Sequence, residues 1–159
     1  MVRLITAGAL FVAVTAASAA GPPSAPDLAV IEACLEKNQA VGAHRGGLCL
    51  ELVAGPCQAR PGGETTRGMV MCLQRELAVW DSLLNRYYGD MIGQLDGTAR
   101  TVLREAQRAW IPFRDKTCAF GPAFYEGGSI GGPLRAQCLM EETARRASGL
   151  KVWLDEMDR

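Results

Sequence analysis

The sequence predicts an all-α domain, a small disulfide-stapled helical bundle in which two short N-terminal helices precede three longer ones. Apolar residues recur every three or four positions over three long segments, a pattern typical of amphipathic helices. Segments rich in glycine and proline separate these periodic segments and mark the turns between them. Six cysteines in a chain of 159 residues indicate disulfides that hold the helices together.

Residues 1–19 have the composition of a secretory signal peptide. Arg3 supplies a positive charge, residues 4–14 are mostly apolar, and Ala17-Ser18-Ala19 provides the small residues that cleavage requires. The apolar run is shorter than a membrane-spanning helix, although a retained anchor is the alternative. We therefore expect a periplasmic or secreted protein without a membrane anchor. Removing these 19 residues leaves 140, enough for one helical domain, which we place at 28–159.

The charge balance argues against two classes of partner. The chain has 17 basic and 17 acidic residues, so its formal net charge at pH 7 is zero. A protein that binds nucleic acid or an anionic membrane surface through its overall charge needs an excess of basic residues. We therefore expect no nucleic-acid partner and no electrostatic attachment to a membrane.

The cysteines are spaced for disulfides and not for a metal site. No Cys-x-x-Cys pair occurs, and His44 is the only histidine, so the ligand sets of zinc and haem sites are missing. We expect no metal and no cofactor. The spacing leaves the pairing open, and we favour bonds between neighbours, namely Cys34–Cys49, Cys57–Cys72 and Cys118–Cys138.

The N-terminal part of the mature chain is expected to contain only short helices. Residues 20–27 contain three prolines and should form a flexible, unpacked segment. Asp27 should cap a helix that runs from residue 28 to about residue 40. A second short helix is expected over about 48–54, followed by a loop over 58–64.

Three longer helices are expected to supply the core. Thr65 or Thr66 should cap the start of the first, and Gly93 and Gly97 bracket its end. Asp96 should cap the second, which Pro112 should kink without ending it, because the apolar period continues beyond the proline. The residues expected to face inward are Val70, Leu73, Leu77, Trp80, Leu84, Tyr87 and Met91 in the first helix, Ala99, Leu103, Ala106, Trp110, Phe113, Thr117 and Phe120 in the second, and Leu139, Thr143, Arg146, Leu150, Trp153 and Met157 in the third.

A bond between Cys118 and Cys138 would set the register of the last two helices. The helices would run antiparallel from the disulfide, and steps of four residues along each would rise equally. The facing pairs are then Arg114 with Glu142, Trp110 with Arg146, and Ala106 with Leu150, while Asp115 is a competing partner for Arg146. Arg146 is expected to lie over the Trp110 ring in a cation–π contact. We interpret this polar cluster as a packing device, and an anion-binding site built on Arg114 and Arg146 is the alternative.

The loop over 121–133 is the candidate for partner binding. It combines aromatic and small polar residues, and a disulfide that closes both ends would lower the entropic cost of binding. The predicted contact residues are Tyr125, Glu126, Gly128 and Ser129, with Phe124 beside them. The alternative, which we favour for the aromatic rings, is a structural turn in which glycines allow positive φ and the rings fold back onto the helices. Pro133 should begin the last helix.

No arrangement of residues indicates an enzyme. The acidic residues of the long helices are expected on solvated faces and not in a shared catalytic cleft; they include Glu76, Asp81, Asp90, Glu105 and Asp115. The chain has no nucleophile elbow, no catalytic Cys–His pair and no phosphate-binding loop. Asn85 and Tyr88 are expected to form hydrogen bonds to a neighbouring helix or loop.

The block Ala-Gln-Arg-Ala-Trp-Ile at 106–111 is the most specific sequence motif. It occurs together with Trp80, Leu84, Asn85, Tyr88, Phe113, Arg114, Asp115, Cys118, Gly128, Ser129, Cys138, Thr143 and Arg146. This combination resembles, over about residues 57–150, the exported domain family named for the lysozyme inhibitor LprI, specifically its N-terminal-like domain. Pro112 is an unusual residue for the motif.

The resemblance implies an exported binding protein that is not an enzyme. Its function would be to inhibit a lysozyme by steric occlusion, with the 121–133 loop entering a cleft on the target. The alternative is a structural or stress-related envelope protein that has no enzyme target. The partner would accordingly be a lysozyme or another envelope protein, and the sequence does not set the oligomeric state.

Overall fold

The computed structural model of the chain describes residues 23–39 and 45–159, which form seven helices and no strand. The helices are α1 (Ala25–Lys37), α2 (Arg45–Leu48), α3 (Ala54–Gln58), α4 (Thr66–Gln94), α5 (Gly97–Thr117), α6 (Phe120–Phe124) and α7 (Gly131–Met157). The prediction of an all-α, disulfide-stapled bundle is confirmed. The predicted signal peptide at 1–19 and His44 lie outside the described residues.

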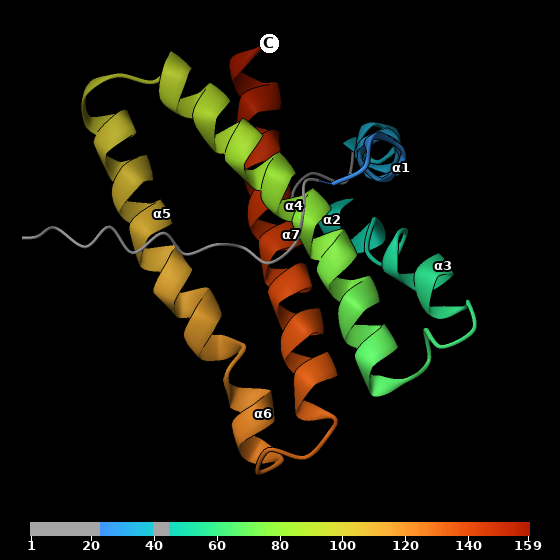
Figure 1. Cartoon of the computed structure of the whole chain (residues 1–159). Helices are drawn as coiled ribbons and strands as arrows, with labels where there is room; N and C mark the ends of the chain where they lie inside the picture. Colours follow the sequence, from blue (N-terminus) through green and yellow to red (C-terminus); the bar gives the residue numbers. More distant parts are fainter. Residues whose placement is uncertain (1–22, 40–44) are drawn as a thin grey trace, which may run out of the picture.

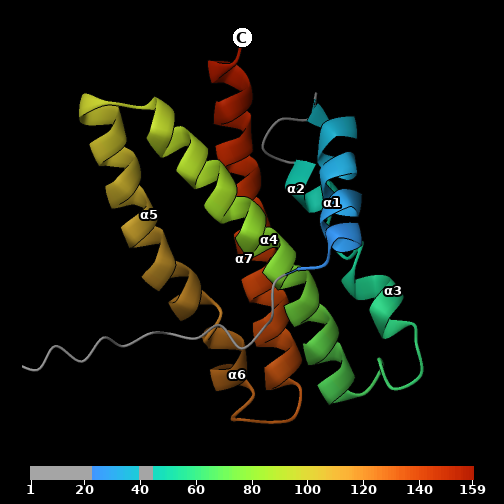
Figure 2. The same ribbon diagram turned by 45° about the horizontal axis from the view of Figure 1, so that its top comes forward.

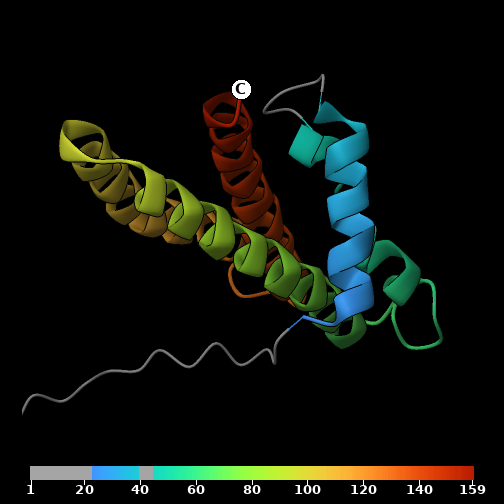
Figure 3. The same cartoon turned by 90° about the horizontal axis from the view of Figure 1, so that it is seen from above.

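The two longest helices, α4 and α7, pack against each other and form the centre of the molecule. The helices α1, α2 and α3 lie on one side of this pair, and α5 with α6 lies on the other (Figures 1 and 2). Seen from above, α7 stands between α5 and α1 (Figure 3). We refer to α5 and α6 together as the arm, because they extend away from the central pair.

The apolar stripe of α4 is buried, as predicted. Its residues Leu73, Trp80, Leu84, Tyr87 and Met91 belong to the hydrophobic core, and Val70 and Leu77 pack against the edge of this core. The helix α7 contributes Ala136, Met140, Ala144, Ala147, Leu150 and Leu154. Two residues of α1, Ile31 and Leu35, close the core on the opposite side from the arm. The core is therefore built around α4, and burial of its large side chains dominates the stability of the fold.

The ends of α4 and α5 follow local signals in the sequence. Thr65 caps α4, since its Oγ1 accepts a hydrogen bond from the Gly68 N–H at 3.0 Å. Asp96 occupies the N-cap position of α5, but its side chain accepts no capping hydrogen bond. The turn is held instead by Arg100, whose Nε donates to the Leu95 carbonyl at 2.5 Å. As predicted, α5 continues through Pro112.

Three disulfides join the cysteines in the pairs predicted. Cys34–Cys49 ties α1 to the segment after α2, Cys57–Cys72 ties α3 to α4, and Cys118–Cys138 ties the end of α5 to α7. The bonded cysteines are 15, 15 and 20 residues apart in the sequence. Closing a loop of this size removes conformational freedom from the unfolded chain, which stabilises the fold by about 3 kcal/mol per disulfide.

The first helix begins earlier than predicted. Ser24 and not Asp27 caps α1, because the Ser24 hydroxyl accepts a hydrogen bond from the Asp27 N–H at 3.3 Å. The prediction of a flexible segment over 20–27 is therefore wrong for residues 25–27, which form the first turn of the helix. Asp27 is buried in that turn and accepts two hydrogen bonds from the Arg75 guanidinium, at 2.7 and 2.8 Å. This ion pair attaches α1 to α4.

Replacing Asp27 with Asn is expected to lower the free energy of unfolding by about 1–2 kcal/mol near pH 7. The hydrogen bonds from Arg75 are the largest cause that holds the pKa of Asp27 below its usual value, and the bond to Ser24 adds to the shift. Because this pKa is lower in the folded state, the stabilisation is present above the unfolded pKa of about 3.9 and is lost as the pH falls through the folded pKa. Urea unfolding at neutral and acidic pH should show the two proteins converging in acid. An unchanged difference at low pH would contradict this assignment.

The segment predicted as a helix over 48–54 is a turn between two shorter helices. The helix α2 ends at Leu48 and α3 begins at Ala54. A side chain at Gly46 in α2 would place its Cβ 2.1 Å from the Ser148 Oγ of α7. Glycine at this position therefore lets α2 lie directly on α7.

Glu76 of α4 explains the turn between α2 and α3. This side chain was expected on a solvated face, but it is fully buried in the core. Its Oε1 accepts hydrogen bonds from the Glu51 N–H at 2.8 Å and the Trp80 Nε1–H at 3.2 Å. Its Oε2 accepts hydrogen bonds from the Val53 N–H at 2.9 Å and the Ala54 N–H at 2.8 Å. The carboxylate thus pairs backbone groups that a continuous helix would have paired within itself.

The loop predicted over 121–133 is shorter than expected. Residues Phe120–Phe124 form α6, and α7 already begins at Gly131, so residues 125–130 connect them. Prolines are compatible with both helices because the N–H groups of a first helical turn have no partner within the helix. Pro133 is the third residue of α7 and not its first.

The largest departure from the predicted packing concerns α5. None of its residues is fully buried, although its apolar stripe was expected in the core; only Leu103 and Trp110 of that stripe are partly buried and pack against the core. The helix α5 is fastened at its two ends, by the turn at Leu95 and by the Cys118–Cys138 disulfide, and it makes few contacts with α7 between them. Trp153 of α7 faces the resulting gap and is 64% exposed, so its assignment to the core is also wrong.

Candidate functional site

The segment from α6 to the start of α7 lies at one end of the molecule (Figure 1), and its side chains form an exposed apolar surface. Phe120, Phe124 and Tyr125 are 69%, 66% and 52% exposed, and Ile130 is also exposed. The ring centroids of Phe120 and Phe124 are 5.9 Å apart, and those of Phe124 and Tyr125 are 5.2 Å apart. The rings contact one another and do not fold back onto the helices, so the structural-turn alternative is wrong for them. We call residues 120–130 the tip.

The backbone of the tip is fixed by its turn and by the disulfide beneath it. Glu126 and Gly127 have φ values of 48° and 77°, which lie in the left-handed region that glycine adopts readily and glutamate does not. The Gly128 N–H donates to the Tyr125 carbonyl at 2.9 Å, and Cys118 lies just ahead of α6. The four residues predicted to bind a partner, Tyr125, Glu126, Gly128 and Ser129, are all exposed here. Their role in binding remains a prediction.

A second surface is a groove of about 1240 Å³ between the arm and α7. Apolar residues of both helices and of the end of α4 line most of it; they include Met91, Leu95, Val102, Leu103, Ala106, Trp110, Phe113, Leu150, Trp153 and Met157. The charged residues that line it, Glu142, Arg145 and Arg146, are the α7 lining residues nearest to Cys138 of the disulfide along the helix. The groove therefore has one polar end and one apolar end.

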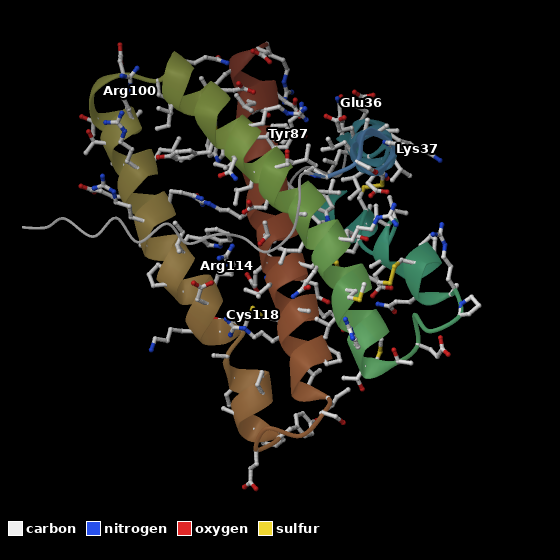
Figure 4. All side chains as sticks on the ribbon, in the orientation of Figure 1. Glu36, Lys37, Tyr87, Arg100, Arg114 and Cys118 are labelled. Atoms are coloured by element: carbon white, nitrogen blue, oxygen red, sulfur yellow. A yellow bond between two sulfur atoms is a disulfide. The ribbon has the colours of Figure 1, made fainter. Side chains whose placement is uncertain are left out.

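The polar cluster at this end contains the predicted residues in different pairings. Arg114, and not Arg146, lies over the Trp110 ring, with its Cζ 5.0 Å from the ring centroid. Arg114 also donates to the Asp115 carboxylate at 2.9 and 3.0 Å. Figure 4 labels Arg114 beside the gap between α5 and α7, with Cys118 below it. The predicted register assumed that each charged group reaches across the gap, whereas Arg114 is paired within its own helix.

The other two charged groups of the cluster are also paired differently from the prediction. Glu142 forms an ion pair with Arg145 of its own helix and not with Arg114. Arg146 Nε donates to the Gln107 side-chain oxygen at 3.0 Å, which is a direct link between α7 and the arm. Burial lowers the pKa of Arg146, and the electrostatic influence of Tyr88 partly opposes that shift. Arg146 thus bonds to the neutral Gln107 side chain and not to the Trp110 ring, which was its expected partner.

Two further sequence assignments change with the structure. Asn85 Nδ2 donates to the Asp81 carboxylate at 3.2 Å, so its hydrogen bond lies within α4 and not between elements. Tyr88 packs against the hydrophobic core. Within residues 23–39 and 45–159, no group of three or more His, Cys, Asp or Glu residues is arranged to hold a metal ion. None of the helices in the described part of the chain combines the length and apolar character needed to cross a membrane.

The sequence did not predict the structural roles of Glu76 and Gln107. Glu76 lies three residues after Leu73 and four before Trp80, a spacing that puts it on the same face as buried residues and could have identified it. A buried carboxylate requires several donors, and such a position therefore predicts a capture site for backbone amides. Gln107 belongs to the 106–111 block, and its role depends on a contact 39 residues away in the sequence, which no local pattern reveals.

Together, the fold and these surfaces define a disulfide-stapled helical protein of the exported type with exposed apolar surfaces. The chain belongs to the LprI family: the family profile described as lysozyme inhibitor LprI matches residues 57–150, more than half of the 159 residues. The predicted resemblance is confirmed. The matched region contains the tip and most of the groove.

Two bacterial proteins are similar to this chain over part of its length. The uncharacterized protein R02472 of Rhizobium meliloti (strain 1021) is 28% identical over 101 residues, which cover 55% of this chain and 73% of that protein. The uncharacterized protein YecT of Escherichia coli (strain K12) is 26% identical over 102 residues, which cover 55% of this chain and 63% of that protein. No solved structure matches the chain.

Proposed function

We propose that this protein is an exported, non-enzymatic binding protein that inhibits a lysozyme by inserting the tip into the substrate cleft of the enzyme. Membership of a family described as lysozyme inhibitors supports the class of target. Three disulfides support export to the periplasm or the medium, since such bonds persist in oxidising compartments. Inhibition would be steric, because a cleft that is filled by the tip cannot admit the cell-wall polysaccharide.

The observation that carries this proposal is the exposed ring cluster of the tip. Phe120, Phe124 and Tyr125 present more than half of their surfaces to solvent at a projecting end of the molecule. Large aromatic side chains dominate the energetics of protein interfaces, and their exposure in a group is unusual without a partner. The disulfide beneath the tip fixes the cluster before binding, so little conformational entropy is lost on association.

Replacing both Phe124 and Tyr125 with Ala is expected to weaken inhibition by about tenfold or more, since each truncation removes an aromatic anchor. The measurement is the rate of cell-wall clearing by lysozyme at increasing concentrations of the oxidised protein. The matched control is Met71→Ala, which truncates a residue that is 59% exposed on α4, outside the tip. The control should inhibit like the parent protein, and both variants should melt like it.

Two outcomes would contradict the proposal at different levels. If the parent protein fails to slow clearing at a large molar excess, lysozyme inhibition would be excluded as the function. If the parent and the tip variant inhibit equally, lysozyme inhibition would stand as the function, but the tip would be excluded as the inhibitory site. The first outcome would favour the alternative function, a structural or stress-related role in the envelope through a partner that is not an enzyme.

A further inference from the structure

The groove between the arm and α7 contains an arginine whose charge has no acidic partner. Glu142 and Arg145 neutralise each other, and Asp115 pairs with Arg114. No carboxylate of the described residues forms an ion pair with Arg146, whose Nε bonds to the neutral Gln107 side chain. Its Nη2 is buried and has no hydrogen-bond partner. A charged group in this position is costly unless an anion or another acceptor approaches it.

The rest of the groove is suited to an apolar chain. From Arg146 towards the C-terminal end of α7, the lining residues are Gly149, Leu150, Trp153 and Met157. Met157 lies eleven positions after Arg146, which corresponds to about 16 Å along a helix. This length is close to that of one lipid acyl chain, which spans half of a hydrocarbon core of about 30 Å. The opposite wall, from α5, is equally apolar and includes Val102, Leu103 and Ala106.

We propose that this groove binds a single-chain anionic amphiphile, with its anionic head at Arg146 and its hydrocarbon tail along the apolar half. The argument rests on charge complementarity: one uncompensated cation lies at the polar end of an otherwise apolar groove, which matches one anionic head and one tail. The helix α5 has no buried residue and is held at its two ends, so it can approach α7 and cover a bound tail. This binding is independent of the tip and of lysozyme inhibition.

Tryptophan fluorescence provides a direct test of the proposal. Trp110 and Trp153 line the groove, while Trp80 is buried in the core on the other side of α4 and should not respond. Titration of the oxidised protein with hexadecanoate below its micelle concentration should shift the emission to shorter wavelength and saturate at one molecule per chain. Octanoate should bind far more weakly, because each buried methylene group tightens binding by up to about fourfold. Hexadecyltrimethylammonium, which has the same tail and a cationic head, should also bind more weakly than hexadecanoate.

The variant Arg146→Met separates head recognition from tail burial. It should weaken hexadecanoate binding by about tenfold or more while leaving the binding of hexadecanol nearly unchanged. The matched control is Arg145→Met, the neighbouring groove arginine, which is already paired with Glu142 and should alter hexadecanoate binding by less than about threefold. A thermal melt of each variant confirms that it is folded before binding is compared.

Four results would overturn the proposal. Equal affinity for the anionic and cationic amphiphiles would exclude recognition of the head charge by Arg146. Equal effects of the two arginine variants would exclude it as well. The absence of saturable hexadecanoate binding would exclude the amphiphile and favour a protein helix as the occupant of the groove. A dimer in light scattering that Val102→Glu dissociates would show that a second copy fills the groove. None of these results depends on the lysozyme assay, so failure of one proposal is distinguishable from failure of the other.

Discussion

Replacing Glu76 with Gln is expected to lower the free energy of unfolding by about 3–5 kcal/mol. The two carboxylate oxygens accept four hydrogen bonds, two each, from three backbone N–H groups and the Trp80 indole. A Gln side chain has one oxygen and one NH2 group, so in either orientation two donors would face a donor inside the core. Buried donors that lose their acceptor carry the full cost of desolvation, which explains the size of the expected effect.

Urea unfolding near neutral pH, followed by circular dichroism, measures this loss. Glu105→Gln is the matched control, because Glu105 is exposed on α5 and the same chemical change there should alter stability by less than about 0.5 kcal/mol. The loss should also be accompanied by faster hydrogen exchange at the Val53 and Ala54 amides. A Glu76→Gln protein as stable as the control would show that the turn between α2 and α3 does not depend on this carboxylate.

Replacing Cys118 and Cys138 together with Ser is expected to destabilise the arm by about 3 kcal/mol. The effect should be local, because α5 has no buried residue and only Leu103 and Trp110 of this helix pack against the core. Without the bond, the arm remains attached through the turn at Leu95 and through weak contacts such as that between Gln107 and Arg146. Segments with little burial open readily, so the arm should become sensitive to proteolysis while the core stays folded.

Limited proteolysis with mass analysis of the fragments measures this effect. Cleavage should concentrate between residues 97 and 130 and should be at least tenfold faster than in the parent, since 1.4 kcal/mol already corresponds to a factor of about ten. The matched comparison is the double replacement of Cys34 and Cys49, which loosens α1 against the core and should leave the arm as resistant as before. Equal protection of the arm with and without its disulfide would mean that the groove is closed in solution.

The sequence allowed the three long helices, the cystine pairs and the core face of α4 to be predicted. Each of these depends on short-range information: apolar periodicity, capping residues such as Thr65, and the distance between cysteines. The burial of Trp80 followed from the same periodicity, because its stripe continues without interruption from Leu73 to Met91. For these features, local preference and tertiary packing agree.

The sequence did not allow the position of α5 to be predicted. Its apolar stripe is as regular as that of α4, but periodicity identifies an apolar face without identifying what covers it. Trp153 was misplaced for the same reason. The partners of Arg114 and Arg146 could not be predicted either, because they depend on how α5 and α7 are placed relative to each other, which no local pattern reveals.

The limits of the family match and the limits of the folding unit do not coincide. The match begins at residue 57, while the amide groups that saturate the Glu76 carboxylate belong to residues 51, 53 and 54. A polypeptide trimmed to the matched region would keep a carboxylate in its interior and discard the groups that make its burial tolerable. The region that homology recognises is therefore smaller than the region that the chain needs in order to fold. The N-terminal helices belong to the folding region.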